Sequence, residues 1–82
     1  MFLHIDEAYY LNDYKLKLKF NNDEIKEVNL ENEIYGEIFE PLKQKDFFKD
    51  FFISSNTIEW KNGADFAPEF LYEIGKDEKS LK

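Results

Sequence analysis

An alternation of apolar and basic side chains in residues 14–20 constrains the fold of this chain more than any other feature. The segment reads Tyr14-Lys15-Leu16-Lys17-Leu18-Lys19-Phe20. Because successive side chains of a strand point to opposite faces of a sheet, the pattern predicts a half-buried antiparallel strand whose lysines face solvent. We assign these lysines the role of opposing aggregation of the sheet. A nucleic-acid contact through them is the weaker alternative, because no exposed aromatic side chains are interleaved with them.

Shorter apolar patterns on both sides of this strand predict the rest of a sheet. Apolar residues between positions 3 and 10 indicate a first strand that ends at a turn near residues 12–13. Asparagine and aspartate at positions 21–23 predict the next turn, because their side chains bond the local backbone and tolerate left-handed conformations. Residues 25–30 then predict a third strand, and residues 57–60 a fourth.

The segment between the third and fourth strands is irregular. Ile34 and Ile38 have helical spacing, but Gly36 lies between them and Pro41 follows, so any helix there is short. The sequence therefore predicts an α+β fold. We expect a small antiparallel sheet of about four strands, a short irregular helical segment, and a C-terminal helix packed on the sheet.

Four phenylalanines gather in residues 45–52. Phe47 and Phe51, and likewise Phe48 and Phe52, are four residues apart, which fits one or two helical turns. We expect both pairs to be buried between the sheet and the final helix. The alternative left open is that one pair is exposed and binds a partner protein or a second copy of the chain in a homo-oligomer. Phe47 and Phe52 are therefore candidate protein-binding residues.

A dense motif precedes and begins the expected C-terminal helix. It reads Trp60-Lys61-Asn62-Gly63-Ala64-Asp65-Phe66-Ala67-Pro68-Glu69-Phe70-Leu71-Tyr72. Asp65 is expected to cap the helix, Pro68 is tolerated in its first turn, and Gly75 ends it. We therefore expect a single compact domain over residues 1–75 and a flexible polar tail over residues 76–82.

This motif is similar to the signature of a family of small bacterial domains, Domain of Unknown Function 2442. The shared features are a tryptophan, Asn-Gly, an aspartate, a proline and a Leu-Tyr ending. The strand at residues 14–20 and the segment Phe39-Glu40-Pro41-Leu42 agree in order and spacing, whereas Lys45 replaces a proline found in many relatives. The resemblance covers essentially residues 3–72 and implies a compact α+β domain.

The resemblance also bears on function. Some members of that family precede a helix-turn-helix DNA-binding region, and some are encoded beside a second small domain in a toxin–antitoxin-like arrangement. This chain reaches only to Lys82, too early for a helix-turn-helix region, which argues against DNA binding by the chain on its own.

The same motif is the sharpest candidate site. As an exposed patch, Trp60 would serve as an aromatic anchor while Asn62 and Asp65 supply hydrogen bonds to a partner protein. In the structural interpretation, which we favour, Trp60 closes the core, the glycine supplies a positive φ and Asp65 caps the helix. The residues assigned a structural role in the motif are Gly63, Pro68, Leu71 and Tyr72.

Composition argues against most catalytic and ligand chemistry. The chain has no cysteine and one histidine, His4, without a nucleophile elbow or a glycine-rich loop, so we expect no catalytic residue and no cofactor. Asp65, Glu69 and Glu73 lie along one side of the expected helix but lack calcium-loop spacing, so we interpret them as a solvated face and expect no metal.

The basic residues also narrow the class of partner. All 11 are lysine, and the net charge is -7, so direct nucleic-acid binding is not expected. No apolar run approaches the roughly 20 residues of a membrane span, and no signal-peptide pattern opens the chain. We therefore expect a soluble cytoplasmic protein.

Together these features predict a non-enzymatic protein-binding module with an unidentified protein partner. The family resemblance implies the antitoxin-like or regulatory member of a bacterial toxin–antitoxin-like pair, with the partner encoded by a neighbouring gene. The alternative is an acidic inhibitor that mimics nucleic acid and occupies a basic groove on a nuclease or a defence complex. Because the acidic residues are mixed with lysines, we rank mimicry second.

Overall fold

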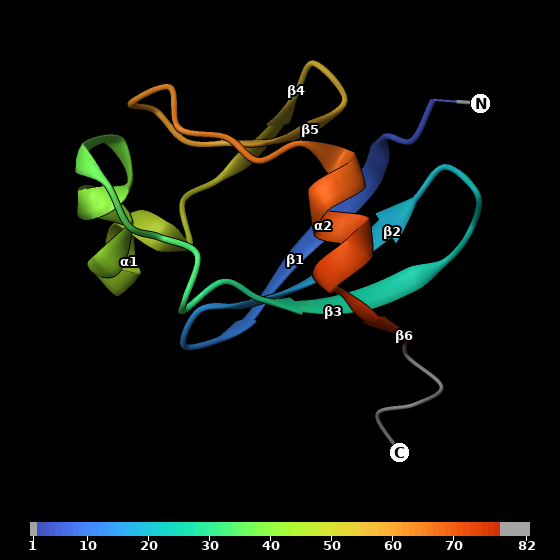
Figure 1. The fold of residues 1–82 in the computed structure, drawn as a ribbon, viewed down its shortest axis with the longest axis horizontal. Helices are drawn as coiled ribbons and strands as arrows, with labels where there is room; N and C mark the ends of the chain where they lie inside the picture. Colours follow the sequence, from blue (N-terminus) through green and yellow to red (C-terminus); the bar gives the residue numbers. More distant parts are fainter. Residues whose placement is uncertain (1, 78–82) are drawn as a thin grey trace.

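The main sheet has the strand order β1-β2-β3-β6, and all neighbours pair antiparallel (Figure 1). The computed structural model describes residues 2–77. β1 (Ile5–Asn12), β2 (Lys15–Phe20) and β3 (Ile25–Asn29) form a meander, and β6 (Lys76–Asp77) adds to β3. With its short helical segment and its C-terminal helix, the chain has the α+β fold that the sequence predicts.

At each turn of the meander an aspartate takes a left-handed backbone conformation. Asp13 has a φ of 46° between β1 and β2, and Asp23 has a φ of 69° between β2 and β3. In the second turn, Oδ1 of Asn22 accepts a hydrogen bond from the backbone N–H of Glu24 at 3.1 Å. This is the local side-chain bond that favours asparagine in turns, and both predicted turns are confirmed.

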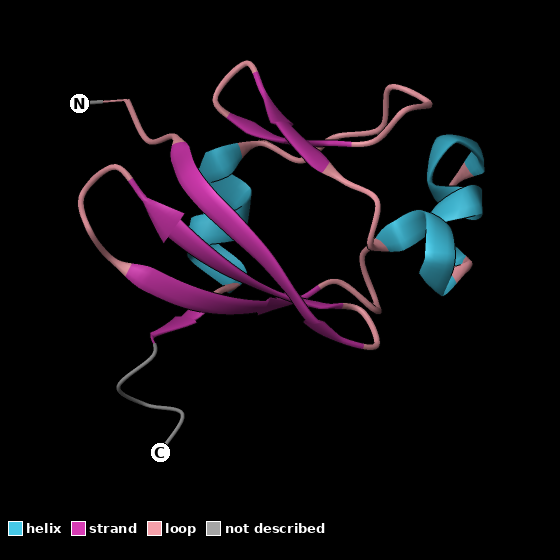
Figure 2. Cartoon of the chain, turned by 180° about the vertical axis from the view of Figure 1, so that it is seen from behind, coloured by secondary structure: helices cyan, strands magenta, loops and turns pink. Residues whose placement is uncertain are grey.

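The alternation in β2 separates two faces of the sheet. Leu16, Leu18 and Phe20 are completely buried on what we call the inner face. α2 (Pro68–Ile74) covers this face and adds the completely buried Leu71. The opposite side, the outer face, carries the lysines of β2, and among the described residues no helix lies over it (Figure 2). The predicted half-buried strand is confirmed.

The strand predicted at residues 57–60 forms, but it belongs to a second, two-stranded sheet. β5 (Thr57–Glu59) pairs with β4 (Phe52–Ser54) across a tight turn. The turn needs left-handed residues, which Ser55 and Asn56 supply with φ values of 49° and 77°. The fourth strand of the main sheet is therefore β6 rather than β5.

The strand β6 lies in the segment expected to be a flexible tail, so that expectation is wrong for its first two residues. The carboxylate of Asp77 lies 3.0 Å from the ammonium of Lys26, which is buried on β3. Gly75 permits the approach, because a Cβ there would lie only 2.9 Å from the Cβ of Lys26. The rest of the predicted tail, residues 78–82, lies outside the described residues.

The irregular segment consists of two short helices. η1 (Glu37–Lys43) is a 3-10 helix that follows Gly36, at a φ of 95°, and contains Pro41. α1 (Lys45–Phe48) is a single turn. A 3-10 helix seldom extends far because its hydrogen bonds are poorly aligned, which agrees with the predicted short segment. In the part of the chain that the structure describes, no helix is long and apolar enough to cross a membrane.

Candidate functional site

Trp60 is completely buried. Its indole N–H donates a hydrogen bond to the backbone carbonyl of Phe48 at 2.7 Å, and the ring of Phe66 packs edge-on with a centroid distance of 6.0 Å. Gly63, at a φ of 89°, closes the following turn, and its N–H donates to the carbonyl of Trp60 at 2.9 Å. Trp60 therefore has the core-closing position of the structural interpretation, and its side chain is not an exposed anchor.

Asn62 is exposed, but its side-chain amide bonds to the backbone of this chain. Nδ2 donates to the carbonyl of Ile38 at 2.8 Å, and Oδ1 accepts from the N–H of Ala64 at 3.2 Å. The amide thereby connects the turn to η1. A partner that used Asn62 would compete with both bonds.

The prediction that Asp65 caps the final helix is wrong. The N-cap of α2 is Ala67, in an extended conformation with a ψ of 139°, and no side chain bonds the N–H groups of the first turn. The residue before a proline avoids helical conformations, so Pro68 sets the start of α2 beyond the reach of Asp65. Asp65 instead forms a backbone bridge with Glu59, and its side chain is exposed.

The end of the motif packs on the inner face. Leu71 is completely buried, and the ring of Tyr72 meets Phe20 edge-on with a centroid distance of 5.2 Å. The hydroxyl of Tyr72 donates to the carboxylate of Glu24, and this bond raises the pKa of Tyr72 above its ordinary value. Pro68 occupies the first position of α2. Leu71 and Tyr72 therefore pack on the inner face, and Pro68 begins α2.

The four phenylalanines are exposed to different extents. Phe48 is completely buried, Phe47 and Phe51 are half-buried, and Phe52 is 44% exposed. The expectation that both pairs are buried is therefore wrong for Phe52, because α1 ends at Phe48 and Phe52 begins β4. Of the two candidates in this segment, Phe52 offers the larger free surface.

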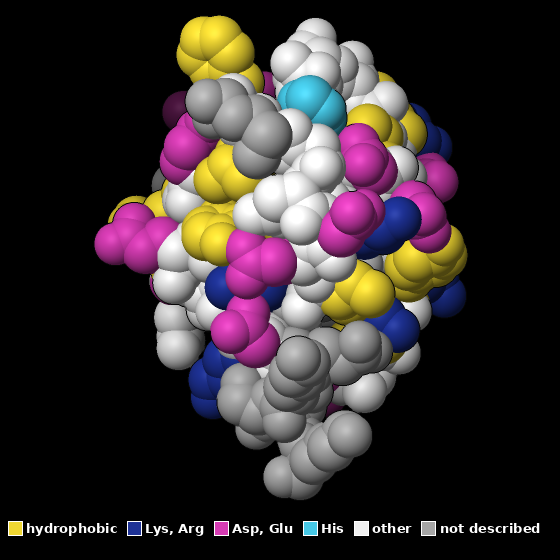
Figure 3. All heavy atoms as spheres, turned by 90° about the vertical axis from the view of Figure 1, so that its right-hand side faces the viewer, with side chains coloured by type: hydrophobic (Ala, Val, Ile, Leu, Met, Phe, Trp, Pro, Cys, Tyr) yellow, Lys and Arg dark blue, Asp and Glu magenta, His cyan; other side chains and the backbone are white. Residues whose placement is uncertain are grey.

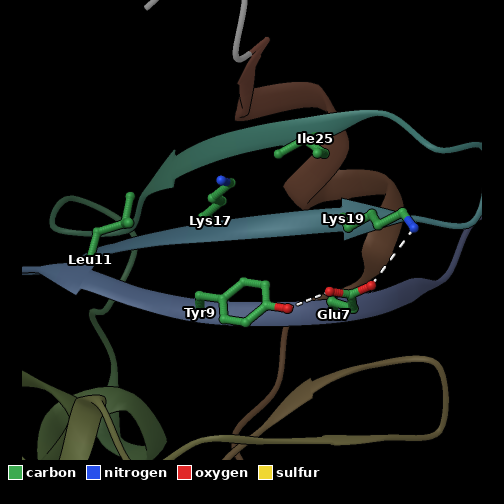
Figure 4. Close-up of a pocket in the computed structure, with 6 residues that line it drawn as sticks. All are labelled: Glu7, Tyr9, Leu11, Lys17, Lys19 and Ile25. Carbon is green, nitrogen blue, oxygen red and sulfur yellow. Dashed lines mark hydrogen bonds and ion pairs between the residues drawn. The ribbon is translucent and has the colours of Figure 1, made fainter.

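A shallow hollow lies on the outer face, across β1, β2 and β3 (Figure 4). Its volume is about 460 Å³, and its lining residues are Glu7, Tyr9, Leu11, Lys17, Lys19 and Ile25. Tyr9 is 52% exposed and Leu11 39%, so apolar surface is accessible beside the lysines. Sequence reasoning identified the lysines but missed their neighbours. The alternate positions of Glu7, Tyr9 and Leu11 in the first strand were the signal that could have found them.

Strand register determines which charges share the outer face, because cross-strand partners point to the same side. Lys17 is opposite Tyr9 on β1 and Glu27 on β3, and Lys76 of β6 is also opposite Glu27. With the other two lysines of β2, the paired strands present four lysines and two glutamates, and Asp23 of the following turn lies 3.8 Å from the ammonium of Lys19. The outer face is therefore locally basic on a chain whose net charge is -7.

A hydrogen-bonded pair lies at one end of the hollow. The hydroxyl of Tyr9 donates to Oε1 of Glu7, and the ammonium of Lys19 lies 3.7 Å from Oε2 (Figure 4). The bond from Tyr9 lowers the pKa of Glu7 below its ordinary value, and the attraction of Lys19 also lowers it. The same bond raises the pKa of Tyr9. The bond therefore favours the ionised form of Glu7 and the protonated form of Tyr9.

Within residues 2–77, no three histidine, cysteine, aspartate or glutamate side chains converge where a metal ion could bind. His4 is half-exposed, with Nε2 at 3.9 Å from Oδ1 of Asp6.

Fold and site define a small α+β domain with one helix on the inner face of an antiparallel sheet and an open, lysine-bearing outer face. A family model described as "Protein of unknown function (DUF2442)" matches residues 5–77. The chain belongs to this family, in agreement with the resemblance seen in the sequence. Comparison with curated proteins and comparison with solved structures each gave no match.

Proposed function

We propose that this chain is a non-enzymatic, cytoplasmic protein-binding module and that the outer face is its binding surface. The observation that supports this most directly is the hollow of about 460 Å³, in which lysines lie beside exposed apolar side chains. Tyrosine and apolar groups surrounded by charged side chains are typical of protein interfaces. In Figure 2, no helix of the described residues lies over this face.

The charges of the outer face favour an acidic segment of the partner. An anionic segment is attracted by the lysines and repelled by the acidic remainder of the chain, which orients the encounter. Tyr9, Leu11 and Ile25 add apolar area beside the ammonium groups. The aliphatic stems of lysines extend such a surface. The segment that fits best therefore combines carboxylates with apolar side chains.

The biological role that we propose is the antitoxin-like or regulatory member of a toxin–antitoxin-like pair. This role rests on the resemblance described above, in which some relatives are encoded beside a second small domain. A member that neutralises another protein needs a surface that binds, and it needs no catalytic residues. The partner would be encoded by a neighbouring gene.

The alternative, an acidic inhibitor that mimics nucleic acid, has weaker support from the charge distribution. Acidic side chains and lysines intermingle on the face drawn in Figure 3. Asp50 lies 2.7 Å from the ammonium of Lys61, and Asp13 lies 3.1 Å from that of Lys45. Carboxylates paired in this way attract a basic groove less strongly than a dense acidic array does.

Co-expression of the chain with the products of its flanking genes tests the proposal. One variant carries Lys15→Gln, Lys17→Gln and Lys19→Gln on the outer face. The matched control carries Lys43→Gln, Lys49→Gln and Lys61→Gln, which removes the same charge from exposed ion pairs elsewhere. We expect the natural chain and the control to bind a flanking product, and the outer-face variant to bind about tenfold more weakly.

The salt dependence of the complex is the second readout. Exposed charges are screened over about 10 Å at 0.1 M salt, so added salt should weaken the natural complex more than the complex of the outer-face variant. Failure to bind any flanking product, or equal binding by the two triple variants, would contradict the proposal.

A further inference from the structure

A second hollow, of about 350 Å³, lies between the loop that precedes η1 and the first turn of α2. The rings of Phe39, Phe66 and Phe70 form a stacked row, with successive centroid distances of 4.9 and 5.9 Å and interplanar angles of 25° and 15°. Tyr35 lines the same hollow and is 70% exposed. The hollow therefore has an aromatic wall in which Tyr35 is exposed, Phe39 and Phe70 are half-buried and Phe66 is buried.

Two carboxylates line the hollow beside these rings. They belong to Glu33, which is half-buried, and to Asp65, which is exposed. No lysine of residues 2–77 lines the hollow. Within residues 2–77, neither carboxylate forms an ion pair, whereas the carboxylates of Asp13 and Asp50 do. Among the described residues, no cation is thus paired with the carboxylates of the hollow.

The backbone holds the rim of the hollow in place. Tyr35 follows Ile34, which is 3% exposed, and precedes Gly36, whose φ of 95° is accessible chiefly to glycine. On the other side, Phe66 is 9% exposed, and its carbonyl accepts a hydrogen bond from the hydroxyl of Thr57 at 2.6 Å. A site held in this way loses little entropy when a ligand binds.

Aromatic faces beside unpaired carboxylates attract organic cations. Of the cationic side chains, arginine fits best, because its planar guanidinium stacks on rings and also bonds carboxylates in a bidentate manner. We propose that this hollow binds an arginine side chain of a partner protein, with the guanidinium beside the phenylalanine row and near Glu33 and Asp65. The chain contains no arginine, so a second copy does not supply this side chain.

This inference goes beyond the proposed function, because it assigns a second surface with the opposite preference for charge. None of the residues that line the second hollow belongs to the outer face. The triple lysine variant of the outer face should therefore leave arginine binding unchanged. The two proposals can fail independently.

Titration of the 15N-labelled chain with a blocked glycine–arginine–glycine peptide tests the inference. We expect the peptide to shift the amide signals of Tyr35, Phe39, Asp65 and Phe70. A matched peptide with citrulline keeps the shape of arginine without its charge and should bind about tenfold more weakly. The lysine peptide should bind about threefold more weakly, because an ammonium lacks the planar fork.

Two variants and one control locate the site. Tyr35→Ala and Asp65→Asn should each weaken binding of the arginine peptide about threefold, through loss of an aromatic face and of a carboxylate. Glu73→Gln removes an exposed carboxylate from α2 that does not line the hollow, and it should change nothing. Unchanged unfolding midpoints would show that the variants keep the fold, as expected for exposed side chains.

The inference is overturned if the arginine peptide causes no shifts in these residues, or if citrulline or lysine binds as tightly. It is also overturned if Glu73→Gln weakens binding as much as Asp65→Asn. If a substitution changes the unfolding midpoint, that variant is set aside. The comparison of the arginine, citrulline and lysine peptides on the natural chain then decides, because it involves no substitution.

Discussion

Lysine side chains are exposed on one face of the main sheet and buried on the other. Lys19 lies on the outer face with 34% of its side chain exposed, near Glu7 and Asp23. Lys26, on the adjacent strand, lies on the inner face and is 8% exposed. Its ammonium lies 3.0 Å from Asp77 and 4.3 Å from the centre of the ring of Tyr72.

The difference shows what a lysine requires on each face. On the outer face, water solvates the ammonium, and ion pairs between exposed groups contribute little. On the inner face, burial of a cation is costly unless partners replace the water. The partners of Lys26 come from α2 and β6, so this lysine connects the C-terminal part of the chain to the meander. The predictions below test that distinction.

The largest expected effect contrasts two positions of one strand. Leu18→Ala removes a completely buried side chain from the inner face and should lower the free energy of unfolding by about 2–5 kcal/mol. Lys15→Ala on the outer face should change it by less than about 0.5 kcal/mol. Urea unfolding measures both. Similar losses for the two variants would mean that the faces are not as distinct as the burial pattern indicates.

A smaller effect is expected at Lys26, the lysine that is buried on the inner face. Lys26→Ala should destabilise the chain by about 2 kcal/mol, because it removes both the packed stem and the cation over Tyr72. Lys26→Met keeps the stem and should cost about half as much. Asp77→Asn should cost less than about 1 kcal/mol, since Asp77 is 58% exposed. If Lys26→Met costs as much as Lys26→Ala, the charge rather than the stem dominates.

The third prediction concerns the close approach of Gly75 to Lys26, which allows β6 to pair with β3. In Gly75→Ala, the new Cβ would lie 2.9 Å from the Cβ of Lys26 and 3.0 Å from the carbonyl oxygen of Leu71. We expect a loss of about 1–2 kcal/mol from this overpacking, together with faster hydrogen exchange in β6. Full stability with unchanged exchange would show that the strand can shift without cost.

The meander could be predicted from the sequence because its signals are local. Alternation identifies a strand within a few residues, and the aspartates mark the turns. The start of α2 could also have been predicted, since Pro68 restricts Ala67 by a local rule that outweighs the apparent cap at Asp65. β6 could not, because its pairing depends on Gly75 and Lys26, which are distant in the chain.

The candidate sites were less predictable than the strands. The lysine row follows from the alternation, but its assembly with Tyr9 and Ile25 depends on register, and β1 has register irregularities at two places. The second hollow joins the loop before η1 to the start of α2, and no local pattern relates those segments. Trp60, considered as a binding residue but interpreted as a core residue, is completely buried and packs in the core.

The smallest expected effect is a pKa change on the outer face. Tyr9→Phe removes the hydrogen bond that is the main cause of the lowered pKa of Glu7, so that pKa should rise toward its ordinary value of 4.5. Lys19 still attracts the carboxylate, so the return should be incomplete. Carboxyl NMR titration measures the change. The control is Tyr35→Phe, which changes an exposed tyrosine of the second hollow and should leave the pKa of Glu7 unchanged.

The direction of each shift gives the pH range in which the bond between Tyr9 and Glu7 stabilises the fold. A lowered carboxyl pKa contributes stability above the ordinary value of 4.5, and this is lost as pH falls through the pKa of the folded state. A raised tyrosine pKa contributes stability below the ordinary value of 10.0, and this is lost as pH rises through the folded value. The stability difference between the natural chain and Tyr9→Phe should therefore be greatest near neutral pH and shrink at both extremes. Tyr9→Phe keeps the ring and removes only the hydroxyl, so a difference that does not change with pH would contradict a contribution from the bond between Tyr9 and ionised Glu7.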